Sequence, residues 1–97
     1  MKTDELKRRL AAGEQLALID VREADEVASV PMLEGSENIP MGQVFVEASK
    51  GTLPKDRKIV TICSKGTRCE IVARELAEKG YDIDYLEGGL AAYGGLS

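Results

Sequence analysis

Histidine and tryptophan are absent from this 97-residue sequence, and cysteine occurs only twice. Without histidine, the chain cannot carry a Ser-His-Asp or Cys-His catalytic arrangement, a histidine-ligated metal site or a histidine proton shuttle. Two cysteines, six positions apart in the sequence, are too few for the disulfide framework of a small secreted protein. Covalent chemistry in this chain must therefore use a group that needs no histidine partner.

Long apolar runs are also missing. No stretch of about 18 consecutive apolar residues occurs, and residues 1–10 lack the apolar segment of a signal peptide. The net charge is −4 and no long basic stripe is present, which argues against a nucleic-acid partner or an anionic membrane surface. We expect a cytoplasmic monomer that binds neither nucleic acid nor membrane.

The residues that are present are those of an ordinary globular protein. Hydrophobic residues make up 43% of the sequence and charged residues 31%. A chain of this length can bury one modest core but not two. We therefore expect a single domain over residues 1–97.

Helical patterns alternate with short apolar runs along the chain. The runs typical of buried strands cover residues 16–21, 58–63 and 81–89, with a very short strand expected at 37–39. Helices are expected over residues 3–13, 22–30, 41–51, 67–79 and 90–93. This order predicts the α/β class, with a central, mainly parallel sheet and helices on both of its faces.

Two of these helices have recognisable ends. Thr3 is predicted to cap the first helix, with Asp4 and Glu5 in its first turn. In the helix over residues 67–79, a buried face is predicted from apolar residues at positions i, i+3, i+4 and i+7, namely Cys69, Val72, Ala73 and Leu76. Gly80 is expected to end that helix.

Cys63 stands where the strand over residues 58–63 passes into the helix over residues 67–79. In a parallel α/β sheet, ligands bind beyond the carboxyl ends of the strands, and backbone N–H groups at a helix start attract anions. We predict that Cys63 is the reactive residue and that the loop behind it, Ser64, Lys65, Gly66, Thr67 and Arg68, binds an anionic substrate. Helix N-termini and nearby cations favour thiolate over thiol.

A thiolate formed in this way can react without a proton shuttle. If it attacks a sulfur atom whose leaving group is a weakly basic oxyanion, the reaction needs neither a general base nor a general acid. Lys65 is expected to draw anions towards a site in a protein of net negative charge. Asp20 and Arg22 are expected to support the loops by hydrogen bonding rather than to take part in chemistry.

Several separated segments resemble rhodanese-type sulfurtransferases, in the order in which that family has them. "CSKGTR" (63–68) resembles the family's active-site loop, C-x-x-G-x-R. "LIDVRE" (18–23) resembles its D-V-R-E segment, "ENIP" (37–40) its N-I-P, and "LEGGLAAY" (86–93) its terminal G-G-x-x-A-W. The family's G-H-I-P-G-A stretch has no such match, because "VPMLEGSENIP" lacks its histidine.

The resemblance implies a rhodanese fold in three layers, with four or five strands because little sequence precedes the first helix. It also implies a thiosulfate sulfurtransferase in which Cys63 carries a persulfide and Arg68 binds the oxyanion. Such an enzyme takes sulfur from thiosulfate or another persulfide donor and passes it to a thiophilic acceptor, a small thiol or a protein. No cofactor and no metal are implied.

Two further functions and a second role for Cys69 are left open by the sequence. A phosphatase or arsenate reductase of related fold has one more residue in its loop, C-x5-R, whereas four residues separate Cys63 from Arg68 here. A non-catalytic regulatory module would more often have lost the loop cysteine. Cys69 is predicted to belong to the buried helix face, and the alternative is a resolving thiol that closes a disulfide with Cys63.

Overall fold

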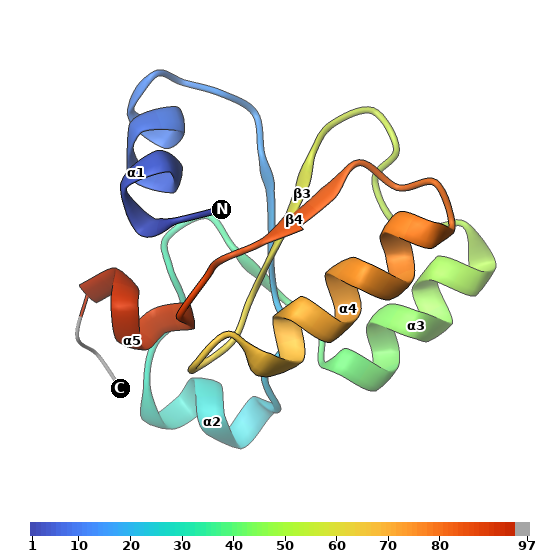
Figure 1. The fold of residues 1–97 in the computed structure, drawn as a ribbon. Coiled ribbons are helices and arrows are strands. Elements are labelled where there is room, and N and C mark those ends of the chain that lie inside the picture. Colours follow the sequence, from blue (N-terminus) through green and yellow to red (C-terminus); the bar gives the residue numbers. More distant parts are fainter. Residues whose placement is uncertain (95–97) are drawn as a thin grey trace.

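The computed structural model describes residues 1–94, in which helices and strands alternate (Figure 1). The helices are α1 (Thr3–Ala11), α2 (Ala24–Ser29), α3 (Met41–Lys50), α4 (Thr67–Glu78) and α5 (Gly89–Gly94). The strands are β1 (Ala17–Asp20), β2 (Glu37–Asn38), β3 (Ile59–Ile62) and β4 (Ile83–Tyr85). Each element lies within one to four residues of the range expected from the sequence.

The four strands form one parallel sheet in the order β2-β1-β3-β4. Ala17 of β1 pairs with Ile59 of β3, which pairs in turn with Ile83 of β4. Parallel neighbours must be joined by crossover connections, and the helices between the strands supply them. The predicted α/β class with a parallel sheet is confirmed, with four strands in the described part of the chain.

Helices cover both faces of the sheet, α3 and α4 on one side and α1 and α5 on the other (Figure 1). Side chains of successive strand residues point to opposite faces. Ile19 and Ile59 accordingly pack in the core that contains Val72 and Leu76 of α4. Leu18 and Val60 pack in the other core, beside Leu6 and Leu90. β1 and β3 are mostly apolar because both of their faces are buried.

The N-cap of the first helix lies one residue before Thr3, its predicted cap. Lys2 occupies the N-cap position without a side-chain hydrogen bond, so the prediction that Thr3 caps this helix is wrong. Thr3 lies inside the first turn, where its buried hydroxyl has no hydrogen-bond partner. The chain before Thr3 is held by Met1, whose amino group donates to Tyr85 O at the end of β4 and whose carbonyl accepts from Glu87 N.

The carboxyl ends of the strands lie at one end of the molecule, where α2 and the starts of α4 and α5 also lie (Figure 1). The loop of residues 63–66 between β3 and α4 is therefore close to segments that are distant in sequence. Among residues 1–94, no helix is long and apolar enough to cross a membrane.

Candidate active site

Cys63 follows the last residue of β3, and its side chain is only 1% exposed. Two backbone N–H groups point at its sulfur atom, that of Gly66 at 3.1 Å and that of Cys69 at 3.4 Å. Gly66 can take part because its backbone has φ 100°, in the left-handed region that side chains disfavour. The chain thus curls around the sulfur atom as the loop sequence predicted.

This environment favours the ionised form of Cys63. The neighbouring Cys69 thiol has the largest effect, and the backbone N–H groups add to it, so that the pKa of Cys63 falls to about 5 despite burial, which acts in the opposite direction. Hydrogen bonds to the charged form of a group lower the pKa of an acid in this way. At neutral pH the site therefore holds a thiolate, as expected from the sequence.

Cys69 lies in the first turn of α4 and is fully buried with Val72 and Leu76, which confirms its predicted place on the buried face. Its Sγ lies 3.3 Å from the Sγ of Cys63, and both cysteines are free thiols. Hydrogen bonding to Cys63, and burial, raise the pKa of Cys69 well above its usual range. Helical periodicity gave no indication of this sulfur–sulfur contact.

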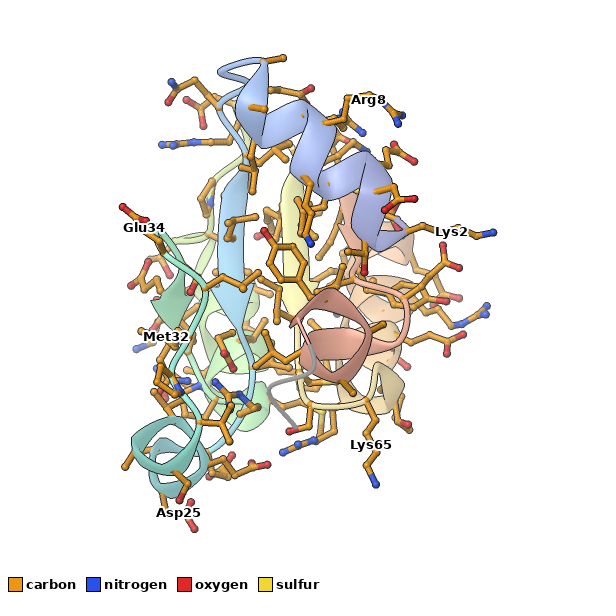
Figure 2. All side chains as sticks on the ribbon, turned by 90° about the vertical axis from the view of Figure 1, so that its left-hand side faces the viewer. Lys2, Arg8, Asp25, Met32, Glu34 and Lys65 are labelled. Carbon is orange, nitrogen blue, oxygen red and sulfur yellow. The ribbon has the colours of Figure 1, made fainter. Side chains whose placement is uncertain are left out.

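The loop residues surround a hollow of about 380 Å³ that opens in front of Cys63. It is lined by Glu26, Cys63, Ser64, Lys65, Thr67 and Arg68. Lys65 is exposed and extends from the same end of the molecule as Asp25 of α2, whereas Arg8 lies at the opposite end (Figure 2). A larger hollow of about 540 Å³ beside β1 and α3 contains no residue of this loop. The smaller hollow is therefore the one that gives access to the thiolate.

Arg68 faces this hollow and is paired with Glu26, a residue that no sequence pattern indicated. Its Nη1 and Nη2 donate to the two carboxylate oxygens of Glu26 at 2.6 and 2.8 Å. The hydrogen bonds from Arg68 are the main reason that the pKa of Glu26 is lowered to about 2. A guanidinium group has five N–H donors, so Arg68 retains donors for a second anion.

Glu26 is linked to a buried network at the end of β1, because Arg22 Nη1 donates to its backbone carbonyl at 3.4 Å. The Arg22 side chain donates to both carboxylate oxygens of Asp20 at 2.8 to 3.1 Å, and both residues are almost fully buried. Asn38 donates to the backbone carbonyls of Asp20 and Arg22. In α2, Glu26 also accepts from the N–H of Glu23, which forms a capping box. The supporting role expected of Asp20 and Arg22 is confirmed.

The turn at Gly88 and Gly89 supports the cysteine loop from the opposite side. The N–H groups of Leu90 and Ala91 donate to the carbonyls of Cys63 and Ser64 at 2.9 and 3.0 Å. A Cβ atom on Gly89 would lie 2.4 Å from the Cys63 carbonyl oxygen, so only glycine fits there. The two adjacent glycines predict a turn, but the sequence gave no indication that this turn contacts residues 63 and 64.

The sequence is similar to a known protein family and to individual proteins. Residues 2–95 match the family described as Rhodanese-like domain. A Bacillus subtilis (strain 168) protein named "Putative sulfurtransferase YtwF" is 39% identical over 95 residues, which are 98% of this chain and 89% of that protein. A protein of Allochromatium vinosum named "Sulfurtransferase" is 32% identical over 92 residues, 94% of this chain and 83% of that one.

The fold has solved counterparts as well. The crystal structure of a rhodanese-like domain protein from Staphylococcus aureus superimposes with a TM-score of 0.83 at 29% identity, covering 97% of this chain and 89% of that one. Sequence and fold agree with the resemblance carried by residues 18–23, 37–40, 63–68 and 86–93. The chain therefore belongs to the rhodanese-like domain family.

Proposed function

We propose that this chain is a thiosulfate sulfurtransferase in which Cys63 carries the transferred sulfur atom as a persulfide. The donor is thiosulfate or another persulfide, and the acceptor is a thiophilic molecule, either a small thiol or a protein. The enzyme acts as a single domain and a monomer in the cytoplasm, where reducing conditions keep both cysteines as thiols.

The observation that carries this proposal is the environment of the Cys63 sulfur. Two N–H groups at 3.1 and 3.4 Å and the Cys69 thiol at 3.3 Å stabilise negative charge on it, without any histidine. A thiolate that exists before substrate arrives can attack sulfur directly. The relatives named sulfurtransferase support the same chemistry.

In the first half-reaction, the Cys63 thiolate attacks the outer sulfur of thiosulfate. A sulfur–sulfur bond forms to Cys63 while the bond from that sulfur to the sulfonate breaks, and sulfite leaves with the electron pair. In the second half-reaction, a nucleophile such as cyanide attacks the outer sulfur of the persulfide, and thiocyanate leaves. The Cys63 thiolate is restored, and no proton is transferred in either step.

The loop residues serve the anionic donor. The free N–H groups of the Arg68 guanidinium bind the oxygen atoms that leave as sulfite, while Glu26 holds the guanidinium plane in place. Lys65 at the rim attracts the anion, and the backbone of Ser64, Gly66 and Thr67 shapes the hollow. Charge developing on a leaving oxyanion is stabilised by donors that are already oriented.

The direct test is the intact mass of the protein after incubation with thiosulfate and removal of the excess. Immediately after loading, the wild type should carry the mass of one additional sulfur atom, which cyanide should remove as thiocyanate. Cys63→Ser should gain nothing. If wild-type protein stays at its original mass with thiosulfate and with a persulfide donor, the chain is a non-catalytic module.

Activity on an aryl phosphate distinguishes the remaining alternative. Only four residues lie between Cys63 and Arg68, one fewer than in the C-x5-R loop of the related phosphatases and arsenate reductases. We therefore expect no hydrolysis of the phosphate ester by protein that accepts sulfur from thiosulfate. Hydrolysis without persulfide formation would identify the chain as a phosphatase.

A further inference from the structure

We propose that Cys69 discharges the Cys63 persulfide within the same molecule, so that the chain releases sulfide and forms a Cys63–Cys69 disulfide when no external acceptor intervenes. This inference rests on the proposed function, because it begins from the persulfide. It assigns to the chain a second, reductive activity in which a dithiol is the final electron donor.

The arrangement of the two sulfur atoms carries the inference. The Sγ atoms are 3.3 Å apart, and the first turn of α4 fixes Cys69 in a fully buried position. The other polar contacts of Cys69 Sγ are the carbonyl oxygens of Gly66 at 3.4 Å and Leu86 at 3.7 Å. Reacting atoms held about 3–3.5 Å apart are close to an attack geometry.

Loading with sulfur makes Cys69 reactive. In the unloaded protein, the thiolate of Cys63 keeps the neighbouring Cys69 protonated, since two adjacent negative charges are disfavoured. In the persulfide, the negative charge moves to the outer sulfur atom, and the Sγ of Cys63 becomes neutral and electrophilic. The strong upward effect of the Cys63 thiolate on the pKa of Cys69 is then reduced.

The reaction balances without another participant. Cys69 Sγ forms a bond to Cys63 Sγ, the bond between Cys63 Sγ and the outer sulfur breaks, and the proton of Cys69 leaves with that sulfur as hydrosulfide. Relative to the unloaded protein, the two cysteine sulfurs lose two electrons and the transferred sulfur gains both. A small dithiol or a protein dithiol then reduces the disulfide by thiol–disulfide exchange.

The inner sulfur is the atom within reach of Cys69. The donor delivers its sulfur from the hollow, which is lined by Cys63 but not by Cys69. The outer sulfur atom therefore extends into the hollow, where external acceptors attack it. Cys69 contacts Cys63 Sγ from the protein interior, so the two routes compete for one persulfide without sharing a path.

The experiment follows a single turnover. Wild-type protein and Cys69→Ser are loaded with thiosulfate under anaerobic conditions, freed of excess, and followed by intact mass and by trapped sulfide. The wild type should release one equivalent of sulfide and end at the mass of the internal disulfide. Cys69→Ser should retain the added sulfur, which cyanide then recovers as thiocyanate. Ile71→Ala, on the exposed side of the same helix, should behave as the wild type.

Loading of sulfur onto Cys63 tests the proposed function, and release of sulfide tests the role of Cys69. If neither the wild type nor Cys69→Ser gains sulfur and the wild type releases no sulfide, the proposed function is contradicted. A wild type that gains sulfur and holds it as long as Cys69→Ser overturns only the present inference. Finding the persulfide on Cys69 with Cys63 free, by mapping of alkylated peptides, also overturns it. Cys69→Ala provides a second variant should the serine variant fold poorly, and the disulfide itself is measured on the wild type alone.

Discussion

A cysteine without a histidine partner depends on its immediate neighbours for ionisation. For Cys63 these neighbours are two backbone N–H groups and one thiol, all provided by residues 66 and 69 of the same loop and helix. The thiol is the only one of the three that a substitution removes without altering the backbone. Cys69 can therefore be tested for its effect on the charge of Cys63 as well as for its own reactivity.

The reactivity of Cys63 should follow its ionisation with pH. With a pKa of about 5, the rate of alkylation by iodoacetamide should rise as pH increases through 5 and level off above 6 to 7. Cys69→Ala removes the S–H donor, so the midpoint should move to higher pH and the alkylation rate at pH 6 should fall. Cys69→Ser keeps a donor and should shift the midpoint less. An identical profile in the alanine variant would show that the backbone alone sets the charge.

Arg68 is the residue expected to bind the departing sulfite. Arg68→Ala should lower thiosulfate turnover by the value of one charge-assisted hydrogen bond, about 1.5–3 kcal/mol or roughly tenfold to a hundredfold. Steady-state thiocyanate formation measures this loss. Arg74→Ala, which breaks an exposed ion pair with Glu70 on the same helix, is the matched control and should retain turnover. Equal rates in folded Arg68→Ala and wild type would remove Arg68 from the mechanism.

At the scale of elements, the start of α5 holds the cysteine loop in place. Gly89 has φ 62° and its Cα faces the Cys63 carbonyl, so a methyl group there meets backbone atoms rather than a movable side chain. Gly35 has a similar φ of 85° but open space around its Cα. A comparison of alanine substitutions at the two glycines therefore separates the cost of backbone strain from the cost of a clash with the loop.

We expect Gly89→Ala to disturb the loop and Gly35→Ala to leave it intact. Both should lose about 1–2 kcal/mol of unfolding free energy, because alanine is strained in the left-handed conformation. Gly89→Ala should lose more, and it should load sulfur from thiosulfate slowly because residues 63 and 64 must move. Urea unfolding and the rate of persulfide formation measure the two effects. Similar loading rates in both variants would argue against a supporting role for α5.

Local sequence patterns predicted the elements more successfully than the contacts between them. Buried faces require apolar side chains. The apolar spacing in α4 and the short apolar runs in β1 and β3 therefore predicted these elements from the sequence alone. The prediction that Thr3 caps α1 is wrong because residues that favour the N-cap position also occur inside the first turn. Cap preference alone does not fix a helix boundary, since the preceding residue can occupy the N-cap position without a side-chain bond.

The parts of the site that the sequence did not reveal are those that come from distant segments. Cys63, Gly66 and Arg68 lie in one short stretch, and its spacing predicted them as site residues. Glu26 meets Arg68 across 42 positions of sequence, and Gly89 meets Cys63 through the packing of a different helix. Neither contact leaves a periodic pattern. Acidic residues are common in the first turn of a helix, where they interact favourably with the positive end of the helix dipole. Glu26 fits that pattern, so its position gave no reason to expect that it pairs with Arg68.

For the molecule as a whole, the buried ion pair of Asp20 and Arg22 affects stability. The pair is 0% and 1% exposed, and it lies where β1 leaves the sheet. Asp20→Ala leaves a buried guanidinium without its partner and should lower the free energy of unfolding by about 3–5 kcal/mol. Replacing both residues, Asp20→Leu with Arg22→Met, should cost less than the single change. Urea denaturation measures both, and a loss below about 0.5 kcal/mol for Asp20→Ala would indicate that the pair behaves like a surface contact.

The exposed position of α2 has a consequence for motion. None of its residues is buried, and Glu26 ties it to α4 through the pair with Arg68, whereas the donors around Cys63 belong to residues 66 and 69. Segments with little buried surface open at a lower free energy than the whole protein unfolds. Transient detachment of α2 would free the two Arg68 nitrogens that now donate to Glu26, in addition to the donors already available, without disturbing the groups that hold the thiolate. The groups that set the charge of Cys63 would then stay in place while the number of free Arg68 donors changes, and amide hydrogen exchange is expected to be faster in α2 than in α4.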